Sequence, residues 1–230
     1  MRRGLAGAAG AGALAWLGPA AAPHAPAIAS ALGIRRRIGG DGVVISFDDG
    51  PHPEATPAVL ELLAARDAKA IFFLVGEQVE RHPSVAAEIA ERGHTIALHG
   101  YRHRNQMRVS PMALAVDLRR AAATIEETTG RRPELYRPPY GIFTPAGLAL
   151  SRRAGWVPLL WSRWGRDWSS RMSPERIAAL ATRDIGPGDV ILLHDADHYS
   201  DPGCWRNTIA ALPRIVDELE RRRLVTVAPA

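Results

Sequence analysis

Short apolar runs alternate with amphipathic stretches from residue 42 to the end of the chain, and this alternation limits the folds open to the sequence more than any other feature. Short β-branched or apolar runs are typical of strands, and the stretches between them have the apolar spacing of helices. Their repeated order indicates βα units around a mostly parallel sheet. At 230 residues the chain suits one such domain and is too short for two of good size.

The expected elements follow from these runs and from the residues that bound them. Strands are predicted over residues 43–47, 70–75, 95–98, 135–136, 156–161, 190–193 and 225–227. Helices are predicted over residues 58–66, 84–92, 111–129, 144–154 and 207–222, with a further one opening at Ser173. Ser110 before Pro111 is a favoured helix start, and Gly130 is a favoured end.

Residues 1–40 differ from the rest of the chain and form the expected leader. They are rich in Ala, Gly and Pro, begin with Arg2 and Arg3, and include Ala20–Ala22, a small-residue site suited to a signal peptidase. We expect a signal-like or anchoring leader over residues 1–40 and a folded domain over residues 41–230. The protein is then secreted or membrane-tethered at the cell envelope. A cytoplasmic protein with a loosely packed leader is the alternative, because the stretch has few strong hydrophobes.

The net charge of +5 does not indicate a nucleic-acid partner. Residues 1–40 carry five arginines and no acid, so removing them from +5 leaves a formal charge of zero for residues 41–230. A nucleic-acid site needs a dense basic face, often with stacking aromatics, and aromatic residues are only 6% here. Cys204 is the only cysteine, which excludes an internal disulfide and a thiolate metal cluster.

Five polar clusters lie at or just past the C-terminal ends of predicted strands, where α/β barrels and open α/β sheets build their active sites. They are Asp48-Asp49-Gly50, His99 with His103, Arg137-Pro138-Pro139-Tyr140, Asp167-Trp168, and His194-Asp195. Each alone has an ordinary explanation, such as a turn, a solvated loop, a surface charge, a helix cap or a hydrogen-bonded core histidine. Their coincidence favours one active site.

The residue types are those of a metal-dependent hydrolase. His99 and His103, one helical turn apart, can direct two imidazoles at one point, and Asp49 can complete a three-ligand set with open positions for water and a substrate carbonyl oxygen. A metal in such a site lowers the pKa of its water to about 7. Asp48 is then placed to act as a base, and His194 to protonate a departing amine.

Arg137 has two possible partners at this stage. Its guanidinium either orients Asp48 directly or pairs with Asp167 and so holds the base in place.

With these residues in place, the sequence resembles the NodB-like polysaccharide deacetylases, also called carbohydrate esterase family four, over about residues 42–227. Five segments resemble the family motifs in order: SFDDGP at Ser46–Pro51, HGYRH, RPPYG, RDWSS and ILLHD. The resemblance implies a single-domain distorted (β/α) barrel with about seven mostly parallel strands. It also implies roles for ten residues: base Asp48, ligands Asp49, His99 and His103, base-orienting Arg137, nearby Asp167, oxyanion-binding Tyr140 N–H, acetyl-pocket Trp168 and Leu192, and general acid His194.

Two positions depart from the family pattern. Gly100 stands directly after the first histidine, where relatives usually carry Ser or Thr, so a supporting hydroxyl is missing. Trp164 stands before Asp167, where relatives often have a further Asp. The first departure predicts looser ligand geometry, and the second predicts a reshaped sugar site.

The resemblance implies metal-dependent removal of N-acetyl groups from N-acetylglucosamine-containing poly- or oligosaccharides of the peptidoglycan or chitin type. Two alternatives stay open: hydrolysis of O-acetyl esters or small cyclic amides and ureides, and a carbohydrate-binding protein with an inactive site. The expected cofactor is a divalent metal, zinc first, with Co, Ni, Mn or Fe suited to the same ligands. The expected partner is the acetylated carbohydrate, bound by a monomer that contacts a membrane only through the leader and binds no nucleic acid.

Overall fold

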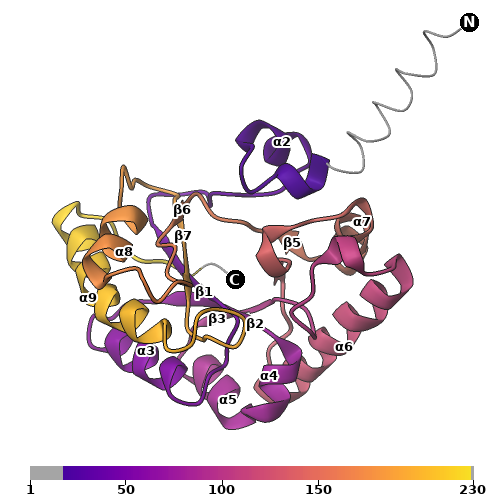
Figure 1. The fold of residues 1–230 in the computed structure, drawn as a ribbon, viewed down its shortest axis with the longest axis horizontal. Helices are drawn as coiled ribbons and strands as arrows, with labels where there is room; N and C mark the ends of the chain where they lie inside the picture. The colour runs from indigo at the N-terminus through magenta and orange to yellow at the C-terminus, as the bar shows by residue number, and fades with distance from the viewer. Residues whose placement is uncertain (1–17, 229–230) are drawn as a thin grey trace, which may run out of the picture.

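A single curled, parallel sheet organises the domain in the computed structural model, which describes residues 18–228 (Figure 1). The strand order is β5-β4-β3-β2-β1-β7-β6, and the paired strands are parallel throughout. The strands are β1 (Val44–Asp48), β2 (Ala70–Leu74), β3 (Thr95–Leu98), β4 (Leu135–Tyr136), β5 (Val157–Pro158), β6 (Arg163–Trp164) and β7 (Val190–His194). This arrangement confirms the predicted distorted (β/α) barrel of about seven strands in one domain.

The helices lie around the outside of this sheet (Figure 1). They are α2 (Pro26–Ala31), α3 (Ala55–Ala64), α4 (Gly76–Arg81), α5 (Pro83–Glu91), α6 (Pro111–Thr129), α7 (Pro145–Ala154), α8 (Pro174–Ala181) and α9 (Trp205–Arg221), with 3-10 turns η1 (Gln106–Arg108) and η2 (Pro139–Gly141). The expected caps of α6 are present, because Ser110 Oγ accepts a hydrogen bond from Ala113 N and Gly130 has a φ of 65°. These caps fix where α6 begins and ends.

The central strands carry the core and set the position of the site. Every residue of β1 and β2 is buried. In the sheet register, the Cα of Asp48 pairs with those of Phe73 and His194. The carboxyl ends of β1 and β7 therefore place Asp48 and His194 side by side, as expected for parallel strands that meet at one edge of a sheet.

Two predicted strands differ from the structure. The apolar run 156–161 was expected to be one strand, but pairing covers only Val157–Pro158, and β6 begins at Arg163. The strand is shorter than predicted because Leu160 N donates to the carbonyl of Arg35, a residue outside the sheet. The predicted strand 225–227 is reduced to an isolated bridge between Thr226 and Val43.

The described end of the predicted leader packs on the domain. Ala29 and Ile34 are buried. Arg35 forms a bridge with Leu159 and Arg37 forms one with Asp189, so this segment lies across the side of the sheet between β5 and β7, below α2 (Figure 1). The packed part of the chain thus includes residues that precede position 41, the predicted start of the folded domain. Residues 1–17 lie outside the described part of the chain, and the leader itself stays a prediction.

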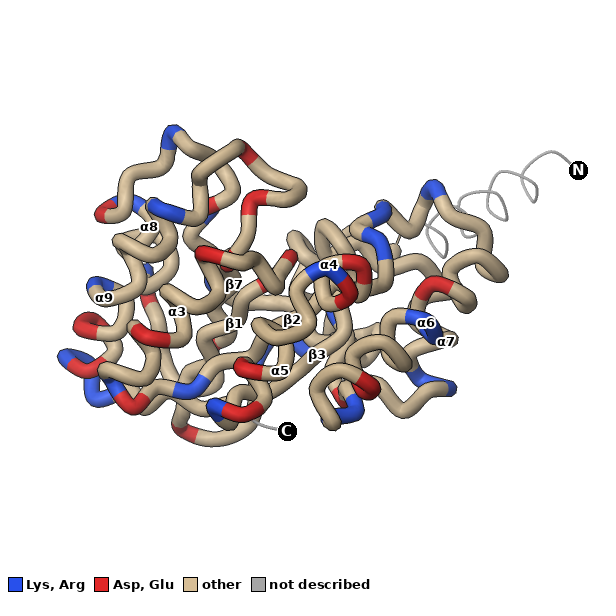
Figure 2. Tube along the Cα trace, turned by 90° about the horizontal axis from the view of Figure 1, so that it is seen from below, with Lys and Arg blue, Asp and Glu red and all other residues tan. Residues whose placement is uncertain are grey.

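Both acidic and basic residues occur along α9 (Figure 2). Arg221 and Arg222 both contact Glu218 at 2.7 Å, and Asp217 contacts Arg66 of the α3 end at 2.5 Å. Such exposed pairs contribute little to stability individually. Among residues 18–228, no helix has both the length and the apolar character needed to cross a membrane.

Candidate active site

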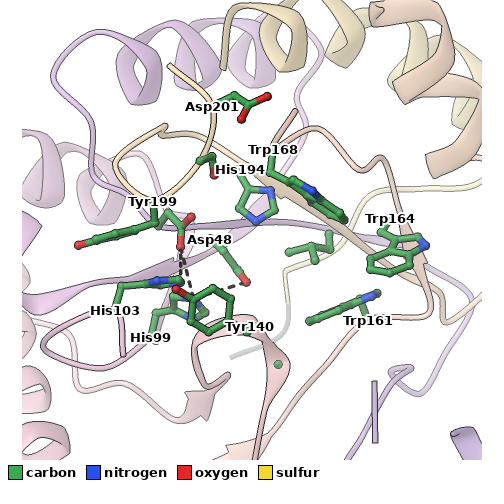
Figure 3. A pocket seen from close by; sticks show the side chains of 14 residues that line it. Asp48, His99, His103, Tyr140, Trp161, Trp164, Trp168, His194, Tyr199 and Asp201 are labelled. Atoms are coloured by element: carbon green, nitrogen blue, oxygen red, sulfur yellow. Dashed lines mark ion pairs between the residues drawn. The ribbon is translucent and has the colours of Figure 1, made fainter. Parts of the chain in front are cut away.

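Three side chains predicted as metal ligands converge at the carboxyl edge of the sheet, where Figure 3 labels His99 and His103. One ligand atom each from Asp49, His99 and His103 lies within 4.8 Å of the others. Asp49 Oδ1 is 3.2 Å from His103 Nε2 and 3.5 Å from His99 Nε2. Asp49 Oδ1 is buried and has no hydrogen-bond partner among the described residues, so a cation would satisfy it. Two imidazoles and a carboxylate are a donor set that suits zinc and related divalent metals.

The electrostatics of Asp49 favour its ionised form. Burial alone would raise the pKa of this carboxyl, but the neighbouring imidazoles of His103 and His99 outweigh burial and hold its pKa well below the usual range. Asp49 also has a φ of 79°, a left-handed conformation that few non-glycine residues adopt. The backbone turn directs this carboxylate towards the two histidines while Asp48 remains on the strand.

Arg137 connects Asp48, the predicted base, to His99, a predicted metal ligand. Its Nη1 lies 2.6 Å from Asp48 Oδ1 and its guanidinium also donates to Ser46 Oγ at 3.0 Å. The Arg137 backbone carbonyl lies 2.8 Å from His99 Nδ1, which leaves His99 Nε2 directed at Asp49. Burial lowers the pKa of Arg137, which the Asp48 carboxylate partly reverses. Of the two partners left open for Arg137, the structure selects Asp48.

His194 approaches from the strand on the other side of β1. Its Nδ1 is 2.9 Å from Asp167 Oδ1, and its backbone N–H donates to Asp167 Oδ2 at 2.7 Å. Thr208 donates a third hydrogen bond to Asp167, which is fully buried. The expectation that Asp167 lies near Arg137 is therefore corrected: Asp167 holds the imidazole of His194, because the loop after β6 runs beside β7 and not beside β4.

A cavity of about 460 Å³ joins these groups. His99 and His103 lie at one end and Trp161 and Trp164 at the other (Figure 3). The predicted pocket residues Tyr140, Trp168 and Leu192 all line it. Trp168 meets the ring of His194 edge-on with centroids 5.9 Å apart, and Trp164 contacts both Trp161 and Trp168. Trp164, which stands where relatives often have an Asp, thus adds a third aromatic ring to the wall formed by Trp161 and Trp168.

The turn residues of the site have specific backbone demands. Tyr140 has a φ of 61° and the residue is 56% exposed, so the turn η2 presents its backbone to the cavity and leaves the ring at the rim.

The turn after β1 has no room for a side chain at Gly50. An added Cβ would lie 2.5 Å from Asp195 Oδ2. Burial raises the pKa of Asp195 to about 7.

Sequence reasoning did not assign Trp161 or Tyr199 to the site. Trp161 lies in a run expected to be a strand, and only the break after β5 turns it into the pocket. Tyr199 lies in the loop between β7 and α9, for which the sequence predicted no element. Its ring stacks on His103 with centroids 4.2 Å apart and an interplanar angle of 11°. Its position five residues after His194 was the available signal.

Comparisons with known proteins agree with this geometry. The sequence profile for polysaccharide deacetylase matches residues 36–158. The chain is 34% identical to the peptidoglycan-N-acetylglucosamine deacetylase of Bacillus cereus, covering 81% of this chain and 86% of that protein. It is 33% identical to the chitooligosaccharide deacetylase of Bradyrhizobium sp., covering 78% and 85%.

A solved structure supports the same assignment at the level of the fold. The crystal structure of a peptidoglycan N-acetylglucosamine deacetylase in complex with 4-naphthalen-1-yl-N-oxidanyl-benzamide superposes with a TM-score of 0.75 at 28% identity, covering 84% of this chain and 88% of that one. The family resemblance carried by the five sequence motifs is confirmed, and the chain belongs to the polysaccharide deacetylase family.

Proposed function

We propose that this protein removes N-acetyl groups from N-acetylglucosamine-containing poly- or oligosaccharides of the peptidoglycan or chitin type, with zinc at Asp49, His99 and His103. The main support is the convergence of three kinds of group on one cavity: a metal-ligand triad, a carboxylate held by a guanidinium, and an imidazole held by a carboxylate. Relatives that carry deacetylase names on these two substrate classes support the choice of sugar.

When bound, the metal supplies Lewis-acid polarisation of the amide carbonyl and lowers the pKa of a water. Asp48, fixed by Arg137, accepts the proton of the attacking water. The N–H of Tyr140, presented by the left-handed turn, donates to the oxygen that gains negative charge. These groups lie on the side of the cavity formed by β1, β3 and β4.

His194 completes the reaction from the opposite side. Its Nδ1 is engaged by Asp167, so Nε2 is the atom free to donate a proton to the nitrogen as the C–N bond breaks. Burial lowers the pKa of His194, but the carboxylates of Asp167, Asp49 and Asp48 outweigh burial and raise the pKa to about 10. The products are acetate and the free amine of the sugar.

The aromatic wall supports a sugar as the substrate. Trp161, Trp164 and Trp168 present apolar rings beside the reactive groups, and such rings suit the apolar faces of pyranose rings. The half-buried positions of Trp164 and Trp168 leave these rings within reach of a ligand that extends beyond the cavity.

Acetate release tests the proposal. The metal-stripped protein is incubated with chitooligosaccharides or peptidoglycan, with and without zinc, and O-acetylated sugar and a cyclic ureide serve as comparison substrates. We expect zinc-dependent release from an N-acetylated polymer. Release from the ester alone, or ring opening of the ureide alone, would contradict the proposed substrate. Sugar binding without turnover at any metal would identify a binding protein with an inactive site.

We also propose export to the cell envelope, on the basis of the small-residue site at Ala20–Ala22. Cleavage there would leave the segment that packs beside β5 attached to the domain. Fractionation of cells tests this proposal: protein found only in the cytosol, at its full mass, would reject export.

A further inference from the structure

The two histidines of the ligand triad are supported differently. His99 has its Nδ1 fixed by the carbonyl of Arg137, whereas His103 Nδ1 is buried and has no hydrogen-bond partner among residues 18–228. Metal-binding imidazoles usually use the second ring nitrogen for such a bond, which sets the tautomer and the ring orientation. Some other contact must therefore orient His103.

The backbone at Gly100 explains why a nearby hydroxyl does not take this role. Gly100 has a φ of 93°, in the region that favours glycine, and its carbonyl accepts a hydrogen bond from Gly76 N at 2.9 Å. A serine at this position would be strained even though there is space for its Cβ. The turn between His99 and His103 thus favours glycine at position 100, and glycine offers no hydroxyl that could form a hydrogen bond with His103.

Tyr199 covers the face of the unsupported imidazole. The two rings are nearly parallel, at 11°, with centroids 4.2 Å apart, and Figure 3 shows them side by side at the metal end of the cavity. Tyr140 also meets His103, edge-on at 4.6 Å, but it lies at the exposed rim. The stack is the contact that can restrict rotation of the His103 ring.

The Tyr199 ring is itself held at its far end. Its hydroxyl donates to Glu77 Oε1 at 2.8 Å and accepts from Gln78 Nε2 at 2.9 Å. Gln78 is buried in α4, which packs against α6. Tyr199 is therefore attached at two points: its backbone belongs to the loop after β7, and its hydroxyl is bound to α4. Together these two attachments fix the plane of the ring.

We propose that Tyr199 is a positioning residue for the metal centre. Its ring, anchored by Glu77 and Gln78, stacks on His103 and orients that imidazole, which is the effect that a hydrogen bond to Nδ1 would otherwise have. The proposal rests on the proposed metal at the triad and is independent of the substrate. It predicts that zinc affinity depends on the aromatic ring at position 199 more than on its hydroxyl.

Zinc affinity, measured without any turnover, tests the proposal. Zinc is titrated into the metal-free full chain in competition with a chromophoric chelator, for wild type, Tyr199→Ala, Tyr199→Leu and Tyr199→Phe. We expect the dissociation constant to rise roughly tenfold or more in Tyr199→Ala and Tyr199→Leu, the range found for lost outer partners of metal ligands, and to stay within about threefold of wild type in Tyr199→Phe. Ser200→Ala alters the adjacent loop residue and should leave the dissociation constant unchanged.

Two further measurements separate positioning from a general structural effect. Thermal unfolding of the metal-free variants shows whether the fold is intact, and Tyr199→Leu keeps the bulk of the site if Tyr199→Ala does not fold. In the cobalt-loaded protein, the visible absorption spectrum reports ligand geometry and should change in Tyr199→Leu but not in Ser200→Ala.

The outcomes distinguish this proposal from the one on which it rests. If wild type binds no zinc, the proposed metal site fails and the role of Tyr199 fails with it. If wild type binds zinc and Tyr199→Leu binds it equally well with an unaltered cobalt spectrum, only the role of Tyr199 is overturned. A loss in Tyr199→Phe as large as that in Tyr199→Ala would also overturn it, because the ring would then not be the contributing group.

Discussion

The carboxylate of Asp167 sets the protonation state of His194, and Asp167→Asn tests this relation. Burial alone lowers the pKa of His194, but the charge and hydrogen bond of Asp167, followed by Asp49 and Asp48, raise it from the ordinary 6.5 to about 10. A pKa raised in this way keeps the imidazole protonated at neutral pH. The proton-donating form is then lost as the pH rises through the raised value.

The size of the expected shift follows from the contacts. Asp167 is the largest of the three carboxylate contributions, and a bound cation offsets the charges of Asp49 and Asp48. With an amide at residue 167, burial dominates, so we expect the pKa of His194 to fall by at least about two units, which is roughly 3 kcal/mol of lost preference for the protonated form. The alkaline limb of the rate profile should move to lower pH by the same amount.

The assay is kcat/KM for acetate release between about pH 5 and 11, beside the zinc content of each variant. Thr208→Val is the matched control, because it removes one hydrogen bond to Asp167 and keeps the charge beside His194. His194→Ala should remove the alkaline limb altogether. An alkaline limb at the wild-type position in Asp167→Asn, with zinc still bound, would refute the reasoning and assign that limb to another group.

Three further results are expected. Asp48→Asn should keep its zinc and lose about a hundredfold or more in turnover, whereas Asp49→Ala should lose zinc and turnover together; elemental analysis beside acetate release separates the two. Arg137→Lys should lower turnover with zinc retained, because one ammonium cannot replace the contacts of the guanidinium to Asp48 and to two backbone carbonyls, and unfolding by denaturant checks that the fold survives. Deleting residues 1–39 should lower the free energy of unfolding by about 2–4 kcal/mol through the lost burial of Ile34 and its neighbours, and by more than deleting residues 1–22, which removes buried Ala22 but keeps Ala29 and Ile34; equal melting curves would contradict this.

The sequence predicted those parts of the fold that local pattern controls. Helix α6 begins and ends where Ser110 and Gly130 indicated, and β3 has the predicted bounds, because caps and short apolar runs act within a few residues. The length of the strand within 156–161 was predicted wrongly because its end depends on a hydrogen bond to Arg35, which is distant in sequence. The hydrophobic periodicity of a short run carries no information about a hydrogen-bond partner that is distant in sequence.

In the site, too, contacts set by short motifs could be predicted, and contacts between segments distant in sequence could not. The convergence of Asp49, His99 and His103 was predictable because motif spacing and the ends of predicted strands determine it. The partner of Asp167 was not, since Asp167 and His194 meet only when the loop after β6 is placed beside β7. Tyr199 reaches His103 across the cavity, and a loop tyrosine has no local signature that distinguishes such a contact from exposure to solvent.

Tyr140 allows the backbone and side-chain contributions to the site to be separated. Its φ of 61° costs an L-residue about 1–2 kcal/mol relative to ordinary conformations, and glycine avoids that cost. Tyr140→Ala and Tyr140→Gly both remove the exposed ring and both keep the N–H, so they differ only in backbone preference. After allowing for the larger entropy of glycine in the unfolded chain, we expect Tyr140→Gly to be more stable than Tyr140→Ala by up to about 1 kcal/mol in denaturant unfolding. If the N–H binds the oxyanion, both variants should retain turnover within about tenfold of each other and of wild type, since the removal of a true oxyanion donor costs roughly a hundredfold or more. A loss of that larger size in both variants, with zinc still bound, would assign the contribution to the phenol ring and not to the backbone.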